Sequence, residues 1–158
     1  MNIISVREIY DEIDWPVIVL LGAMIPVGRA LESTGTTAWM ANAILQVTEG
    51  LPAVALLTMI LVVTMFLSDI INNAATALVM APIGVAIATS LGVSSDAFLM
   101  AVAVGASCAF LTPIGHQSNT LVMGPGGYRF GDYWRMGLPL EVIIVTVSVP
   151  LLLIVWPL

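Results

Sequence analysis

The stretch FLSDIINNAAT, residues 66–76, decides how this chain can fold. It places a cluster of polar side chains between two apolar runs, 52–67 and 74–91. The first run has only 16 residues, whereas a helix that crosses a bilayer upright needs about 20. Two short apolar segments around a polar interruption predict a backbone break near 71–74, in a hairpin or a broken helix. The polar residues of the cluster are Ser68, Asp69, Asn72 and Asn73.

A second polar interruption follows the apolar run 97–111. The next residues, TPIGHQSN, combine a proline, a glycine and several polar side chains. Proline lacks the N–H group that a helix interior requires, and lipid offers no substitute partner for the freed backbone groups. We therefore predict a second break at 113–119.

The composition places the chain in a membrane. Of its 158 residues, 59% are hydrophobic and 9% are charged, and the mean hydropathy is +1.07, whereas soluble domains carry about a quarter charged residues. Because lipid cannot bond to the backbone, a spanning chain satisfies its peptide groups within helices. We predict an all-α, multi-pass integral membrane protein of the plasma membrane, with residues 1–158 as a single transmembrane domain.

Charge and motif content exclude several classes of protein. The chain has four arginines and no lysine, so it offers no basic face for a nucleic acid. It lacks the GxSxG, HExxH and GxxxxGK motifs, and we expect no enzyme. The single Cys108 is expected to be a small buried apolar residue. The first ten residues do not have the pattern of a signal peptide, so membrane insertion is assigned to internal helices.

The remaining segments predict further helices and loops. Residues 15–32 predict a helix, 33–35 a turn, and 36–47 a helix too short for a full upright span. Arginines and aromatic side chains in 128–137 predict a loop or an interfacial stretch. The last run, 138–158, is long enough to cross a bilayer.

Each polar residue in the breaks has two interpretations. An amide or a charge at membrane depth can mark a ligand site, yet polar side chains also hold transmembrane helices together. Two consecutive asparagines within a break favour a ligand site. Asp69 stays open between a cation or proton site and a hydrogen-bonding role inside the break. His116 has no acidic or cysteine neighbours of the kind that zinc requires, so we expect no zinc site.

On these motifs the chain resembles the divalent anion/sodium symporter family, among the citrate-transporter-like ion permeases. Residues 13–35 resemble the opening of that family's second inverted repeat. Asn72-Asn73-Ala74 resembles its Ser-Asn-Thr hairpin tip, and 113–119 resembles its Pro-x-Gly/Ala-Thr-Pro-Pro-Asn loop. The resemblance implies one inverted repeat with a re-entrant hairpin and a broken transmembrane helix. It further implies the C-terminal half of a larger permease, with a missing N-terminal repeat or partner half, and a homodimer when complete.

The resemblance also implies two ligand sites. In that family the hairpin tip and the loop together hold a sodium ion, largely with carbonyl oxygens, and the tips hold the anionic substrate. One cation must touch both breaks, so we expect the breaks to lie against each other. No cofactor is expected beyond this sodium ion, and no catalytic residue. Carried over to this sequence, the sodium ligands are Ser68, Ile71, Asn73 and Gly115, and the substrate-binding residues are Asn72, Asn73, His116 and Gln117.

The implied function is secondary active transport of a small anion, such as a dicarboxylate, sulfate or a similar oxyanion, coupled to sodium. Asn72 stands where the family has serine and Ala74 where it has threonine, so the substrate need not be the usual dicarboxylate. Two alternatives stay open. One is a proton-coupled or arsenite-type permease, for which Asp69 would serve, and the other is a structural membrane subunit whose breaks only pack helices.

Overall fold

The computed structural model describes residues 15–48 and 50–158, and within them all regular secondary structure is helical. Three helical segments are long and apolar enough to cross a membrane: Ala53–Ile70, Asn73–Leu91 and Phe130–Val155. The all-α membrane architecture is therefore confirmed. The acidic N-terminal residues lie outside the described part. The helices in chain order are α2 (Trp15–Ser33), α3 (Thr36–Val47), α4 (Ala53–Ile70), α5 (Asn73–Leu91), α6 (Ser95–Ala106), α7 (Gln117–Met123), the 3-10 turn η1 (Phe130–Asp132) and α8 (Tyr133–Val155).

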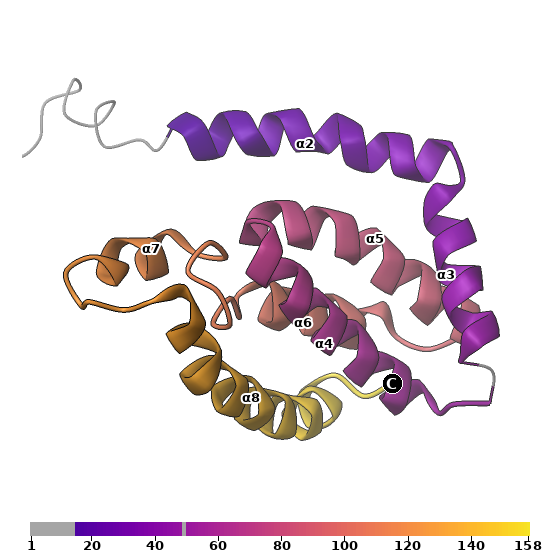
Figure 1. Ribbon diagram of the computed structural model, residues 1–158. Helices are drawn as coiled ribbons and strands as arrows, with labels where there is room; N and C mark the ends of the chain where they lie inside the picture. Colours follow the sequence, from indigo (N-terminus) through magenta and orange to yellow (C-terminus); the bar gives the residue numbers. More distant parts are fainter. Residues whose placement is uncertain (1–14, 49) are drawn as a thin grey trace, which may run out of the picture.

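The first two helices form an arm along one side of the molecule. Helix α2 runs above α5, and α3 turns sharply away from it toward the start of α4 (Figure 1). The turn depends on Gly35, whose φ of 71° lies in the left-handed region, where glycine has no steric penalty. The predicted turn at 33–35 and the predicted short helix are both confirmed.

Helices α4, α5 and α6 form the centre of the fold. Their facing sides bury Leu57, Ile87 and Phe98 completely. Helix α6 approaches α4 closely at Gly105, where a Cβ atom would lie 2.8 Å from the carbonyl oxygen of Leu61. A side chain at this position would therefore push the two helix backbones apart.

The first predicted break lies between α4 and α5. Ile71 and Asn72 are extended, with ψ angles of 161° and 155°. The Asn72 side chain then caps α5, because its Oδ1 accepts a 2.8 Å hydrogen bond from the N–H of Ala75. A short polar side chain at this position satisfies one of the unpaired N–H groups of a helix start.

The second break begins earlier than the sequence predicted. Helix α6 ends at Ala106, and α7 already begins at Gln117. The unwound segment is therefore 107–116, not 113–119. The residue just before this segment has a partner that is distant in the sequence: the Ala106 carbonyl accepts a 2.7 Å hydrogen bond from Ser68 Oγ. An apolar run contains no local signal for such a contact.

The side chain of Asn119 holds the unwound segment 107–116 in place. Its Nδ2 donates to the carbonyl oxygens of Ala109 and Thr112, at 2.7 and 3.1 Å. The carbonyl of Asn119 in turn accepts a 2.7 Å hydrogen bond from the Tyr133 hydroxyl. This asparagine therefore replaces helical hydrogen bonds that the break has lost.

Helix α8 returns the chain along the lower side of the molecule toward the start of α4 (Figure 1). It begins at Tyr133, so of the two forms expected at 128–137, a loop or an interfacial stretch, the loop is wrong from Tyr133 onward. These residues start a 23-residue helix, and their interfacial position stays a prediction. Gly137 brings α8 against the break, because a Cβ atom there would lie 2.7 Å from the backbone carbon of Phe110.

Replacing Gly105 by alanine is expected to destabilise the helical centre. The added methyl group would meet the backbone of α4, and overpacking a tight interior costs about 1–3 kcal/mol. The thermal unfolding midpoint in detergent should fall accordingly. Gly22→Ala is the matched control, because a Cβ atom at Gly22 would meet nothing within 4 Å. Equal midpoints for the two variants would contradict the close approach of α6 and α4.

Candidate functional site

The two breaks lie against each other, as predicted. Leu111 N–H donates a 2.8 Å hydrogen bond to Asp69 Oδ1, and Thr112 Oγ1 donates a 2.5 Å hydrogen bond to the Asp69 carbonyl. With the Ser68 bond to Ala106, three hydrogen bonds join the end of α4 to the last residue of α6 and the unwound segment after it. Residues about 40 positions apart in sequence thus form one polar centre.

The predicted sodium ligands converge at this centre. Ser68 Oγ lies 2.9 Å from Asn73 Oδ1. Gly115 is packed so closely that a Cβ atom on it would lie 2.9 Å from the carbonyl oxygen of Ser68. Ile71 occupies the turn between Ser68 and Asn73. Three of the four predicted residues are therefore brought together in space, and the fourth links them along the chain.

The carbonyl of Ala106 belongs to the same group and was missed in the sequence. Ser68 Oγ lies within hydrogen-bonding distance of both Asn73 Oδ1 and the Ala106 carbonyl. A hydroxyl group has one hydrogen, so it cannot donate fully to both acceptors. The Ser68 hydroxyl group can therefore satisfy only one of these two acceptors at a time. The only sequence signal was a run of small residues, 105–109, within an otherwise apolar stretch.

The predicted substrate-binding residues are arranged differently. Asn72 and His116 each cap a helix: Asn72 accepts from Ala75 N–H, and His116 Nδ1 accepts a 3.1 Å hydrogen bond from Ser118 N–H. Their side chains and that of Gln117 are exposed, whereas Asn73 is half-buried. Among the described residues, no hydrogen bond joins either asparagine to His116 or Gln117. The structure therefore places these four residues on two separate helix starts.

The sequence left open whether Asp69 binds a cation or a proton or forms hydrogen bonds inside the break. In the structure it accepts hydrogen bonds from Leu111 and Thr112. It also has a neighbour that the sequence reasoning missed, because its carboxyl group lies close to that of Glu141 of α8. Both residues are buried, with 2% and 6% of their surface exposed. Glu141 is an isolated carboxylate within a long apolar run, and such a residue in a membrane span is by itself a signal of function.

Comparison with known proteins agrees with a transporter. The family model described as "Citrate transporter" matches residues 1–158. An uncharacterized transporter of Synechocystis, sll0640, is 47% identical over 145 residues, which cover 92% of this chain and 24% of that relative. Sodium/sulfate cotransporter 1 of Chlamydomonas reinhardtii is 31% identical over 85% of this chain and 15% of its own length.

A relative with lower identity matches a similar share of this chain. The sodium-dependent dicarboxylate transporter SdcS of Staphylococcus saprophyticus is 24% identical over 90% of this chain and 27% of its own length. The chain therefore spans about a quarter or less of the length of these relatives. Because the family model covers every residue from 1 to 158, the chain belongs to the citrate transporter family, and the names of the family and of these relatives point to transporters and not to enzymes.

Proposed function

We propose that this chain is the C-terminal inverted repeat of a larger permease that carries a small oxyanion across the membrane together with sodium. In this proposal α4 and α5 form a re-entrant hairpin, and α6, the unwound segment and α7 form a broken transmembrane helix. The other repeat would come from the remaining length that the longer relatives have. No covalent chemistry is required, because alternating access moves the elements around a fixed site.

The observation that carries the proposal is the cluster of neutral oxygens around Ser68. Ser68 Oγ lies 2.9 Å from Asn73 Oδ1 and 2.7 Å from the carbonyl oxygen of Ala106. Neutral hydroxyl, amide and carbonyl oxygens are hard ligands of the kind that hard cations prefer. We assign the sodium ion to this centre, with the carbonyl groups of Ile71 and Gly115 completing its ligands.

The substrate is assigned to the start of α5. The N-terminal end of a helix carries unpaired N–H groups and a partial positive charge, which favour an anion. Asn72 accepts a hydrogen bond only through its Oδ1, so its NH₂ group can donate to an oxyanion. On the facing break, a neutral His116 whose Nδ1 accepts from Ser118 carries its proton on Nε2, and Gln117 adds a further amide.

The relatives support this pair of ligands. One is named a sodium/sulfate cotransporter and another a sodium-dependent dicarboxylate transporter. Sulfate and dicarboxylates share a doubly charged set of oxygens that needs donors and positive potential. A site built from amide NH₂ groups and a helix start meets that need without a fixed positive side chain, which leaves the choice between the two anions to the geometry of the complete site.

Sodium dependence provides the first test. In proteoliposomes that contain the complete permease, uptake of radiolabelled sulfate or succinate should require a sodium gradient, because the proposed ligands around Ser68 are neutral oxygens whose charge does not change with pH. Replacing sodium by choline should abolish uptake. Full uptake driven by a pH gradient alone in sodium-free buffer would reject the sodium assignment and favour a proton-coupled permease.

Replacing Asn73 by aspartate should weaken substrate binding but not sodium binding. The substitution keeps the size and the Oδ1 atom near Ser68, but it replaces the NH₂ donor by negative charge beside the proposed anion site. Like charges placed together cost several kcal/mol, so substrate affinity should fall at least about tenfold, while sodium binding is retained. Equilibrium binding of labelled substrate and sodium-dependent thermal shifts would measure the two effects.

Asn42→Asp is the matched control for the Asn73 variant. Asn42 is exposed on α3, which is outside both breaks. Its replacement introduces the same charge at a distance from the proposed site, and substrate affinity should not change. An equal loss of affinity in both variants, at comparable expression and folding, would favour a helix-packing role for the asparagines.

A further inference from the structure

One hydroxyl group inside the molecule lacks a hydrogen-bonding partner. It belongs to Thr76, at the end of the first turn of α5, which has 1% of its surface exposed. Among the described residues, Thr76 Oγ1 is one of three buried side-chain atoms without a partner, and the other two are carboxyl oxygens. An unpaired buried polar group destabilises a fold, so its presence in a native structure requires an explanation.

Other hydroxyl groups on the helices have partners of a regular kind. Thr64 of α4 is completely buried, and its Oγ1 donates a 2.6 Å hydrogen bond to the carbonyl of Ile60, four residues earlier. Thr76 does not follow this pattern, because the Asn72 carbonyl accepts the N–H of Thr76 but not its hydroxyl group. The hydroxyl of Thr76 is therefore available to another partner. The regular bond recurs at Thr58, Thr89, Ser90 and Thr146.

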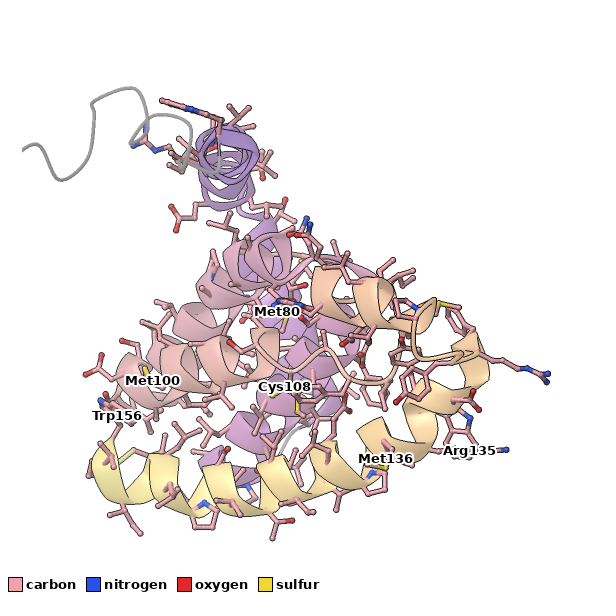
Figure 2. The ribbon with its side chains drawn as sticks, turned by 90° about the vertical axis from the view of Figure 1, so that its left-hand side faces the viewer. Met80, Met100, Cys108, Arg135, Met136 and Trp156 are labelled. Atoms are coloured by element: carbon pink, nitrogen blue, oxygen red, sulfur yellow. The ribbon has the colours of Figure 1, made fainter. Side chains whose placement is uncertain are left out.

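Helix geometry places Thr76 on the face of α5 that points to the interior. Successive residues of an α-helix are about 100° apart, so Thr76 lies about 60° around the helix from Asn73 and about 40° from Met80. Met80 and Ile87 on this face are buried, and Figure 2 shows Met80 toward the middle of the molecule. Residues of α5 that line the groove toward α2, such as Leu78, lie on another side.

The same face of α5 meets the end of α6 at the level of Thr76. The two helices are joined by a short turn and run in opposite directions (Figure 1). A Cβ atom at Gly84 would lie 3.6 Å from the side chains of Phe98 and Val102 of α6. Gly84 is eight residues after Thr76, and eight residues of helix span about 12 Å. Thr76 therefore lies opposite Ala106 and the residues directly after it.

Ala106 belongs to the cluster of neutral oxygens around Ser68. Ser68 Oγ lies 2.7 Å from the Ala106 carbonyl oxygen and 2.9 Å from Asn73 Oδ1. Asn73 is three residues before Thr76, and side chains at this spacing are neighbours on a helix, with Cβ atoms about 5–6 Å apart. The unpaired hydroxyl of Thr76 thus faces the place where these oxygens meet.

We propose that Thr76 Oγ1 is a further ligand of the sodium ion assigned to this cluster. The inference rests on the proposed sodium site, and it adds a residue that the family resemblance did not supply. A hydroxyl oxygen is a neutral, hard ligand of the same kind as the amide and carbonyl oxygens already assigned. A bound ion would give the Thr76 hydroxyl the partner that it otherwise lacks.

Replacing Thr76 by valine tests the inference, because valine keeps the branched shape and removes the hydroxyl. In sodium-free buffer the thermal unfolding midpoint of the complete permease in detergent should stay or rise, since removing an unpaired buried oxygen costs nothing. Added sodium should raise the midpoint less than in the wild type. The Kd for sodium, from the midpoint as a function of sodium concentration, should increase about fivefold. Thr76→Ser restores the hydroxyl and should recover the wild-type Kd.

Thr64→Val is the matched control, because Thr64 is equally buried but its hydroxyl already bonds to Ile60. Its loss should change the midpoint equally with and without sodium and leave the Kd unchanged. A wild-type Kd in Thr76→Val would overturn the inference, and a lower midpoint in sodium-free buffer would then identify a bound water as the partner.

Failure of the underlying proposal has a different signature. If sodium does not raise the midpoint of the wild-type permease, the proposed sodium site is wrong, and the role of Thr76 falls with it. If valine prevents folding, the same sodium titration of Thr76→Ala against Thr76→Ser decides, because these two variants differ only in the hydroxyl group. Equal Kd values for alanine and serine would overturn the inference, and a higher Kd for alanine would support it.

Discussion

Everything at the centre of this protein depends on the hydrogen bonds by which its two helix breaks satisfy each other. A buried unwound segment has peptide groups that no helix satisfies, and each buried group left without a partner costs about 1–3 kcal/mol. The Asp69 carboxylate and carbonyl accept from Leu111 and Thr112, and Ser68 donates to Ala106. The site between the two breaks is therefore held in place by hydrogen bonds from both of them.

Close backbone approach is the second requirement, and two glycines provide it. A Cβ atom at Gly115 would lie 3.0 Å from the Cα of Asp69, and one at Gly137 would lie 3.0 Å from the backbone nitrogen of Leu111. The first contact seats the second break on the end of α4. The second brings α8 near enough for Glu141, one turn after Gly137, to reach Asp69. A larger side chain at Gly115 would move the second break away from Asp69, and one at Gly137 would move α8 away from the second break.

Features with a local cause could be predicted from the sequence, and features with a distant cause could not. The first break follows from Asn72 and Asn73 themselves, because the asparagine cap lies within the break. The start of the second break was placed too late, since α6 ends at Ala106 through a bond from Ser68, 38 residues earlier. Glu141 was overlooked for the same reason: its partner Asp69 is 72 positions away, and only the fold brings them together.

Two neighbouring residues at the end of α4 face different partners, and helix geometry explains how. Consecutive side chains on an α-helix differ in direction by about 100°. Ser68 therefore turns toward Asn73 and Ala106, whereas Asp69 turns toward Leu111 and Glu141. The first group consists of neutral oxygens, and the second contains two carboxyl groups. Because the first group bonds to the last residue of α6 and the second to the unwound segment that follows it, movement of that segment would alter the surroundings of both.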